Sequence, residues 1–217
     1  MIVRLVGSEM CIRDSFLDLR RAHVNAMFRL RGKVLQFGRE HLISEGFLET
    51  HTPKIVATAT EGGADLFPMQ YFDRPAFLNQ SPQLFKQLCM SGGLERVFEI
   101  GPAFRAEKSD TYRHLAEFIS FDIECSWAND DDVMGVLERM LHHIWKSVAE
   151  EKESQDLIAT INAYRAEQGE EPVEVIVPEL PFPRVEYDDA IRIIKEKGGT
   201  VEWGDDCLLY TSDAADD

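Results

Sequence analysis

The sequence lacks the features that mark membrane-spanning and secreted proteins. No apolar run approaches the roughly 20 residues needed to cross a bilayer, and no secretory signal pattern opens the chain. Only four of the 217 residues are cysteines, and their spacing is typical of neither a disulfide framework nor a metal site. Together these absences predict a cytoplasmic protein that works in a reducing environment.

Positive charge is also scarce, because 23 Lys and Arg residues face 39 Asp and Glu residues, for a net charge of −16. Proteins that bind nucleic acid usually carry a basic footprint, so any such contact here requires a local basic patch. One candidate patch contains Arg20, Arg21, Arg29, Arg31 and Lys33. The overall acidity is informative about solubility rather than about the fold.

Two stretches carry the apolar periodicity of amphipathic helices. In residues 19–45 and 130–153, apolar side chains recur at steps of three and four, which predicts a helix in each range. Gly46 is the expected C-cap of the first helix. In the second, His142 and His143 are adjacent and do not share a helix face, so the pair does not indicate a metal site.

The chain is long enough to bury one substantial core, and its hydrophobic content of 44% is ordinary for a globular protein. Residues 167–179 are acidic and without periodicity, which predicts a surface linker. Residues 181–199 then predict a short strand followed by a helix from about Asp188 that stops at glycine.

Both ends of the sequence resemble translated transposase adapters from sequencing libraries. Residues 5–15 read LVGSEMCIRDS and residues 207–217 read CLLYTSDAADD. An adapter coding for the first stretch contains ATGTGTATAAGAGACA, the reverse complement of TGTCTCTTATACACAT in one coding for the second. We therefore expect residues 1–15 and 207–217 to be adapter artefacts, excluded from fold reasoning.

The stretch from Phe98 to Glu124 reads as two apolar strands joined by a charged loop, the pattern of a β-hairpin. Arg105 and Glu107 are two residues apart, so they share one face of the strand. An ion pair between them in a structural hairpin is the ordinary interpretation. An Arg-x-Glu pair on a sheet also suits a nucleotide, because the guanidinium forks onto phosphate and the carboxylate accepts from an amine.

The letters FRAE at 104–107, followed by RHL, EF, D and E between Arg113 and Glu124, resemble motif 2 of the class II aminoacyl-tRNA synthetases. The form is the one found in aspartyl-tRNA synthetases of the archaeal and eukaryotic type. The resemblance covers most of residues 16–206. It implies an α+β fold, the class II catalytic domain with an antiparallel β-sheet flanked by helices, here incomplete because motif 3 is missing.

The same resemblance implies how this stretch binds ATP. Arg105 is the expected catalytic residue, gripping the α-phosphate, with Arg113 and His114 near the outer phosphates. Glu107 is expected to accept a hydrogen bond from the adenine amine, and Phe118 to stack on the adenine ring. The loop between the strands is expected to meet the acceptor end of tRNA.

Residues 77–90 predict a strand leading into a helix, with Ser81 as N-cap and Pro82 at the first helical position. Gln83 and Lys86 share a face near the start of that helix. A solvated lysine is the ordinary expectation. The segment also resembles the QSPQLFK segment of aspartyl-tRNA synthetases, which implies that Lys86 pairs with the side-chain carboxylate of aspartate while Ser81 and Gln83 help to hold the amino acid.

Two further residues belong to this implied aspartate site. Residues 58–65, TATEGGAD, form a polar, glycine-rich loop. By itself the loop is an ordinary turn, but it resembles the loop that closes over the amino acid in the family, with Glu61 reaching the amino group. Asp122 is expected to contact the same ammonium group, because opposite charges pair.

The helix at 19–45 and the strand after it, ending at Pro53, are ordinary as an amphipathic helix, a turn and an edge strand. With motif 2 downstream, their order resembles motif 1, which builds the dimer interface in the family. The resemblance therefore implies a homodimer with Pro53 at its interface, and a broad apolar helix face left open on an isolated chain.

These implications predict an aspartate–tRNA ligase that uses ATP and Mg²⁺ and charges tRNA for aspartate, with tRNA for asparagine left open. Motif 3, the Mg²⁺ ligands and the anticodon reader are expected outside residues 16–206, so we expect this chain alone to be inactive. The alternatives are an asparaginyl-tRNA synthetase, an asparagine synthetase on the same fold, and a non-catalytic dimerisation or RNA-binding module. Lys86 favours aspartate, because the asparaginyl enzymes of this subgroup lack a lysine there.

Overall fold

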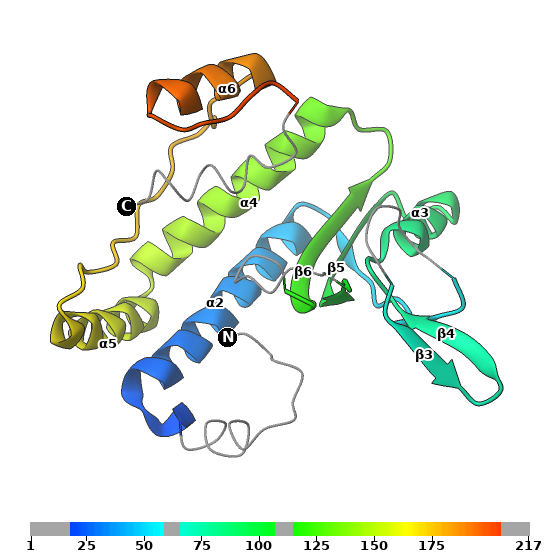
Figure 1. Ribbon diagram of the computed structural model, residues 1–217, viewed down its shortest axis with the longest axis horizontal. Helices are drawn as coiled ribbons and strands as arrows, with labels where there is room; N and C mark the ends of the chain where they lie inside the picture. Colours follow the sequence, from blue (N-terminus) through cyan, green and yellow to red (C-terminus); the bar gives the residue numbers. More distant parts are fainter. Residues whose placement is uncertain (1–17, 59–65, 107–114, 205–217) are drawn as a thin grey trace. The chain divides into compact units, whose positions relative to one another are not determined.

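A computed structural model describes residues 18–58, 66–106 and 115–204, and it divides the chain into a unit ending at Pro178 and a unit starting at Glu179 (Figure 1). The helices of the first unit are η1 (Asp18–Arg20), α2 (Ala22–Ser44), α3 (Gln83–Ser91), α4 (Asp130–Glu150) and α5 (Lys152–Gln168). Its strands are β1 (Leu48–Glu49), β2 (Ile55–Val56), β3 (Pro68–Tyr71), β4 (Arg74–Leu78), β5 (Arg96–Phe104) and β6 (Glu117–Cys125).

The strands form two three-stranded sheets, in the orders β1-β5-β6 and β2-β4-β3. The long β5–β6 ladder is antiparallel and runs from Arg96 opposite Cys125 to Phe104 opposite Glu117, which confirms the predicted hairpin. In contrast to the antiparallel sheet that we expected, β1 runs parallel to β5. The chain between them passes through the second sheet and α3, the kind of long crossover that parallel strands require.

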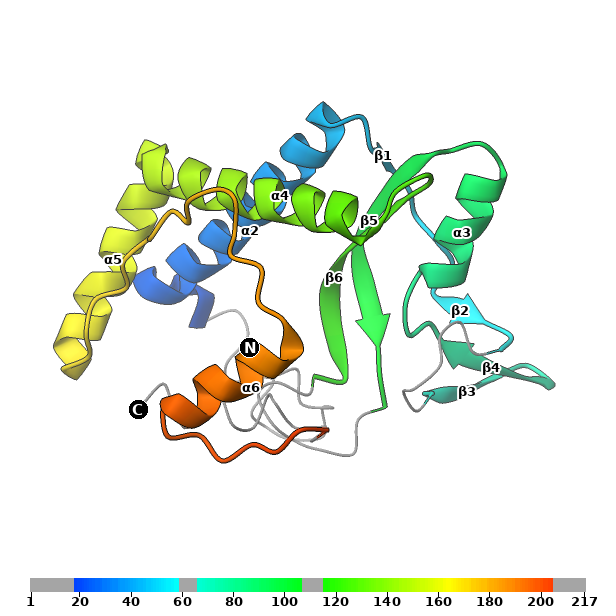
Figure 2. The same cartoon turned by 90° about the horizontal axis from the view of Figure 1, so that it is seen from above.

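The β5–β6 ladder lies between α3 on one side and α2 and α4 on the other (Figure 2). It separates the hydrophobic core from a polar face. Phe98 and Ile100 of β5 and Phe121 and Ile123 of β6 belong to the core cluster, which they share with side chains of α2 and α4. Because side chains alternate along a strand, the intervening residues point to the opposite face. The α3 helix contacts β5 and β6 as well, and the ladder lies between it and the α2–α4 pair.

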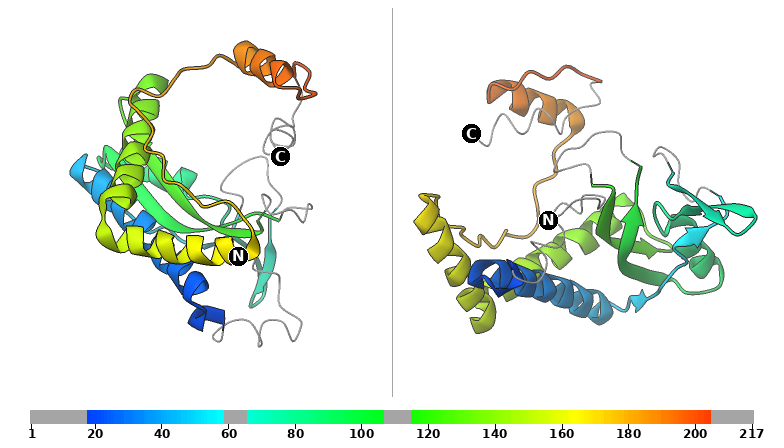
Figure 3. Two further views of the ribbon diagram at one scale, coloured as in Figure 1. Left: turned by 90° about the vertical axis from the view of Figure 1, so that its left-hand side faces the viewer. Right: turned by 60° about the horizontal axis from the view of Figure 1, so that its bottom comes forward.

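The first predicted helix is confirmed as α2, and Gly46 follows it with a φ of 83°, a conformation that glycine adopts without strain. The second is interrupted: α4 ends at Glu150, Glu151 has extended backbone, and α5 starts at once. The prediction of a single helix over 130–153 was therefore wrong in its last turn. The α5 helix, which packs against α2 (Figure 3), was not predicted from the sequence.

Where α5 packs on α2, acidic side chains at the start of α5 pair with residues of the candidate basic patch. Lys33 of α2 lies 2.6 Å from a carboxylate oxygen of Glu151 and 2.8 Å from one of Glu153, and Arg29 also pairs with Glu153. These hydrogen bonds raise the pKa of Lys33 and lower the pKa of both carboxyl groups. Much of the patch is thus neutralised by acidic partners from within the chain.

A cluster of charged and imidazole groups joins the end of α2 to α4. The Glu45 carboxylate accepts two hydrogen bonds from Arg139, at 2.7 and 2.8 Å, and His41 Nε2 lies 3.2 Å from Glu45 Oε1. The His143 ring is 5.1 Å from the His41 ring. Burial lowers the pKa of His41, against the opposing effect of Glu45, and the hydrogen bond from Arg139 lowers the pKa of Glu45.

The second unit contains α6 (Tyr187–Glu196), whose apolar face buries Ile191, while Val201 is buried after the helix ends. The predicted helix from about Asp188 is confirmed, but the short strand expected before it is wrong, because residues 182–186 form no strand. None of the helices that the structure describes, in either unit, is both long enough and apolar enough to cross a bilayer.

Candidate functional site

The polar face of the β5–β6 ladder carries a dense set of chemically capable side chains. Register pairs Glu99 with Asp122 and Ala103 with Phe118, and Glu124 lies two residues beyond Asp122 on the same face. The ladder continues through a hydrogen bond from Arg105 N to Ala116 O of 3.0 Å. Period-two geometry therefore places Arg105, Phe118 and Asp122 on one face, opposite the core.

Lys86 reaches this face from α3 and is only 1% exposed. Its ammonium group donates to Asp122 Oδ1 at 2.5 Å and to the Ile123 carbonyl at 3.2 Å, and it lies 3.2 Å from Glu124 Oε2. Ser120 Oγ in turn donates to the second oxygen of Asp122. Lys86 is therefore not the solvated lysine of the ordinary interpretation: it is a buried cation held by two carboxylates.

Arg105 and Phe118 form a second contact on this face. The Arg105 guanidinium carbon lies 5.5 Å from the centre of the Phe118 ring, within the range of a cation–π interaction. The two residues predicted to hold the phosphate and the adenine of ATP thus lie side by side. The expected partner Glu107 is outside the described residues, as are Glu61, Arg113 and His114.

The segment leading into α3 is buried at Asn79, Gln80 and Ser81. Ser81 Oγ accepts a hydrogen bond from the Gln83 backbone N–H at 3.3 Å, which fixes the first turn of the helix. The helix begins one residue later than predicted, because Pro82 is its N-cap and Gln83 its first residue. Ser81, Gln83 and Lys86 therefore follow one another along a single rigid segment, and Lys86 carries its ammonium group to the polar face.

Sequence reasoning missed one buried ion pair on the same face. Glu99, 2% exposed, pairs with Lys54 and accepts the Thr52 backbone N–H at 3.1 Å. Its carboxylate lies over Gly101, where an added Cβ would approach Glu99 Oε1 to 2.8 Å. The sequence signal for this pair was a charged residue, Glu99, inside an otherwise apolar strand. The pair ties the chain around Pro53, the predicted dimer-interface residue, to β5.

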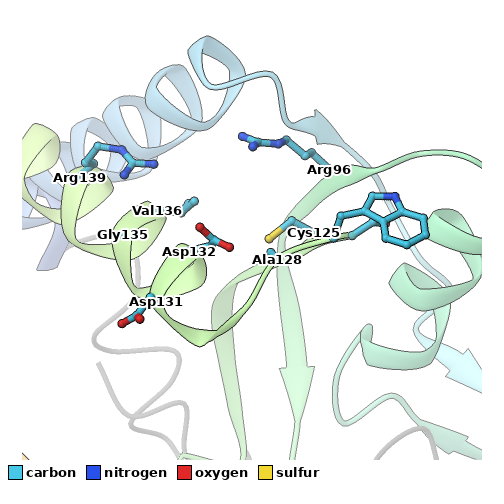
Figure 4. A pocket seen from close by; sticks show the side chains of 10 residues that line it. Arg96, Cys125, Ala128, Asp131, Asp132, Gly135, Val136 and Arg139 are labelled. Carbon is cyan, nitrogen blue, oxygen red and sulfur yellow. The ribbon is translucent and has the colours of Figure 1, made fainter.

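A separate cavity of about 290 Å³ lies at the other end of the ladder, where Arg96 and Cys125 meet the start of α4 (Figure 4). It contains none of the predicted site residues. Its charges are largely matched from within the protein: Arg139 pairs with Glu45, Arg96 donates to the Glu45 carbonyl, and Asp132 completes the capping box of α4. The polar face near Arg105, rather than this cavity, is the candidate functional site.

Comparison with known proteins identifies the family of the chain. A model of the family described as tRNA synthetases class II (D, K and N) matches residues 7–216 of the chain. The chain belongs to this family. The resemblance inferred from motifs 1 and 2 is therefore confirmed, and the α+β arrangement of this class II synthetase chain agrees with that of its structural neighbours.

The curated relatives of this class II synthetase chain include the aspartate–tRNA(Asp/Asn) ligase of Archaeoglobus fulgidus. It is 52% identical over 191 residues, which are 88% of this chain and 42% of the relative. The aspartate–tRNA(Asp) ligase of Thermoplasma volcanium is 46% identical over 195 residues, 90% of this chain and 43% of the relative. The chain thus spans less than half the length of the curated relatives that it matches.

The solved structures that share the fold include the following two. Asparaginyl-tRNA synthetase from Pyrococcus horikoshii complexed with asparaginyl-adenylate superposes with a TM-score of 0.79 and 33% identity, over 97% of this chain and 46% of that one. Aspartyl-tRNA synthetase from Entamoeba histolytica gives a TM-score of 0.73 and 30% identity, over 99% of this chain and 38% of that one. Both aspartyl and asparaginyl enzymes are thus structural neighbours of this class II synthetase chain.

Proposed function

We propose that these residues belong to an aspartate–tRNA ligase, which activates aspartate with ATP and transfers it to tRNA. The observation that carries the proposal is the shared polar face, where Arg105 lies against Phe118 and Lys86 of α3 pairs with Asp122. The relatives named as aspartate–tRNA ligases, at 46% and 52% identity, support the same reaction.

In the proposed first step, an oxygen of the aspartate α-carboxylate attacks the α-phosphorus of ATP in line. The bond to the bridging oxygen of the β-phosphate breaks, which gives aspartyl-adenylate and pyrophosphate. In the second step, a hydroxyl at the 3′ end of tRNA attacks the activated carbonyl and AMP leaves. Neither step requires a protein nucleophile, so the work of the site is to position groups and stabilise charge.

Arg105 is proposed to neutralise charge on the α-phosphate as the attacking oxygen approaches. The Phe118 ring, now against the Arg105 guanidinium, provides an apolar surface on which adenine stacks. Glu107, Arg113 and His114 stay predictions for the adenine amine and the outer phosphates.

Aspartate carries one ammonium and two carboxylate groups, and the Lys86–Asp122–Glu124 cluster offers charges of both signs within about one hydrogen-bond length of each other. We propose that Asp122 receives the substrate ammonium while Lys86 turns toward the side-chain carboxylate. Ser81, Gln83 and Glu61 stay predictions for the remaining polar contacts.

Mg²⁺ belongs to the proposal only in its general form, as the metal that accompanies ATP. Among residues 18–58, 66–106 and 115–204, no group of three His, Cys, Asp or Glu side chains is arranged to hold a metal ion. Asp122 and Glu124, the acidic residues of β6 that share a face with Arg105, are both paired with Lys86. The described residues do not fit a resident Mg²⁺ site, so the roles proposed above belong to the side chains of the protein itself.

The test is aspartate-dependent exchange of pyrophosphate into ATP, measured on a full-length protein that carries these residues. Arg105→Ala should abolish exchange. Arg96→Ala is the matched control, because Arg96 also lies along β5 with its guanidinium 5.4 Å from an aromatic ring, but at the far end of the strand. Exchange that survives Arg105→Ala would refute the proposed role.

The same assay separates the alternatives. Exchange that depends on asparagine rather than aspartate would favour an asparaginyl enzyme. A non-catalytic RNA-binding module would bind tRNA and show no exchange with either amino acid. Loss of ATP binding but not of tRNA binding in Arg105→Ala supports the enzyme.

We also propose that the protein is a cytoplasmic homodimer whose interface includes Pro53 and α2. Several apolar side chains of α2 and of the strands after it are exposed, among them Met27, Ile43, Leu48 and Ile55. An apolar surface of this kind is typical of an association interface. Sedimentation equilibrium of the full-length protein tests the dimer, and a monomer at micromolar concentration would contradict it.

The assignment of residues 1–15 and 207–217 to adapters stays a prediction, since both ranges lie outside the described residues. Sequencing the source DNA outward from primers inside residues 16–206 tests it, because this reads the codons on either side. Flanking codons that reproduce LVGSEMCIRDS would refute it.

A further inference from the structure

Asn79 is a buried amide at the junction of three segments that carry predicted site residues. It is 1% exposed and lies just after β4, between the chain around Pro53 and the start of α3. Its position was not singled out by the motifs, which begin with the letters that follow it. Its hydrogen bonds nevertheless connect all three segments.

The side chain bridges two of them. Asn79 Nδ2 donates to the Pro53 carbonyl at 3.0 Å, and Asn79 Oδ1 accepts the Ser81 backbone N–H at 3.1 Å. An amide is the side chain that supplies a donor and an acceptor from one planar group. The partners also fix its orientation, because only the NH₂ group can face a carbonyl and only the oxygen can face an N–H.

The Asn79 backbone connects the third segment. Its N–H donates to the Lys54 carbonyl at 2.9 Å, and its carbonyl accepts the Phe104 N–H at 3.0 Å, next to Arg105. These two bonds need no particular side chain and survive any substitution other than proline. The side-chain bonds are therefore the part of the junction that mutation can remove selectively.

We propose that the Asn79 side chain is a positioning residue that fixes the Ser81–Lys86 segment against Pro53, and so sets the geometry of the aspartate pocket. This inference rests on the proposed function. Ser81 is the next link, because its hydroxyl accepts the Gln83 N–H at 3.3 Å and starts the helix that carries Lys86. A shift at Ser81 is passed directly to that rigid helix.

The division between side-chain and backbone bonds predicts a selective kinetic defect. Losing the two side-chain bonds frees the pocket segment, while the bond from Phe104 continues to hold the strand end that carries Arg105. In the full-length protein, Asn79→Ala should raise KM for aspartate about tenfold, a loss comparable to one or two hydrogen bonds, and leave KM for ATP within about twofold.

Asn79→Asp isolates the Pro53 contact, because a carboxylate keeps the acceptor for Ser81 N–H but faces the Pro53 carbonyl with an oxygen. It should raise KM for aspartate at least as much as the alanine variant. Asn162→Ala is the matched control: its side chain also bridges two backbone groups, the Val173 carbonyl at 3.0 Å and N–H at 2.8 Å, but in the α5 region.

The experiment is pyrophosphate exchange with aspartate and ATP varied in turn, together with thermal unfolding of each variant. A rise in KM for aspartate alone in both Asn79 variants, absent from Asn162→Ala, supports the inference. Equal rises for both substrates, or an unchanged KM in Asn79→Asp, overturn it. If Asn79→Ala does not fold, the KM values of Asn79→Asp for aspartate and for ATP decide between these outcomes.

The same measurements distinguish this inference from the proposed function. If the unchanged protein shows no aspartate-dependent exchange, the proposed function fails and this inference fails with it. If the unchanged protein is active and the Asn79 variants match it, only the positioning role of Asn79 is overturned.

Discussion

Replacing Lys86 with methionine removes a buried cation and keeps a long unbranched side chain in its place. The Lys86 ammonium contacts Asp122, Glu124 and the Ile123 carbonyl at distances between 2.5 and 3.2 Å. Its loss leaves two carboxylates close together without a counter-charge. Breaking a buried ion pair in this way costs about 3–5 kcal/mol of folding free energy.

The lower end of that range applies here, because the Asp122 and Glu124 side chains are 22% and 20% exposed and regain some water. We therefore expect Lys86→Met to lower the free energy of unfolding by about 3 kcal/mol. With a urea m-value of about 2 kcal/mol per M, the midpoint should fall by about 1.5 M. Urea titration followed by circular dichroism measures the shift.

Lys33→Met is the matched control, because Lys33 also pairs with two carboxylates that are two residues apart in the sequence, at 2.6 and 2.8 Å. Its partners are more exposed, at 31% and 43%, so screening weakens the pairs. The two variants thus compare one interaction at two depths. If Lys86→Met costs no more than Lys33→Met, the reasoning from burial is refuted.

Two further predictions concern α2. Gly38→Ala should destabilise the protein by about 1–3 kcal/mol, because the added Cβ would lie 2.7 Å from the Phe121 ring. Gly32→Ala should instead stabilise the protein by about 0.5–1 kcal/mol, because an added Cβ there meets nothing within 4 Å. The same urea titration measures both changes. Burial holds the pKa of His41 below its ordinary 6.5, so the unfolded chain binds more protons at this residue than the folded chain does. The free energy of unfolding should therefore fall as the pH drops below 6.5. In His41→Gln, the thermal midpoint should depend less on pH between about pH 7 and pH 5.

Each of these has an outcome that contradicts it. Stabilisation of the protein by both glycine variants would show that Phe121 moves to accommodate the added methyl group. For His41, the control for the loss of an imidazole is His51→Gln, at an exposed position. The Glu45 carboxyl, whose pKa is lowered, loses its contribution only as pH falls below 4.5. A pH profile that stays steep in His41→Gln above that value would refute the assignment.

Much of the local structure follows from the sequence alone. Apolar residues at steps of three and four located α2 and most of α4, and the two apolar stretches within 98–124 located the hairpin. These features depend on the period of the backbone, which neighbouring residues specify. The motif letters added roles that periodicity could not supply, because they resemble a known family.

The break between α4 and α5 could not be predicted in this way. Glu151 has an ordinary helix-compatible sequence around it, but its backbone is extended there and its carboxylate pairs with Lys33 of α2. The Lys54–Glu99 pair and the Asn79 junction were missed for the same reason. Their partners lie far apart along the chain and meet only after the sheets have formed.

Lys86 shows most clearly where sequence stops and tertiary structure begins. Its place on the first turns of a helix was predictable from Ser81 and Pro82, within one residue. That its ammonium is buried against Asp122, 36 residues away, depends on α3 docking on the polar face of β6. The sequence by itself determined which charges and faces this synthetase chain presents, whereas packing decided which of them meet, because burial turns a solvated charge into one that requires a partner.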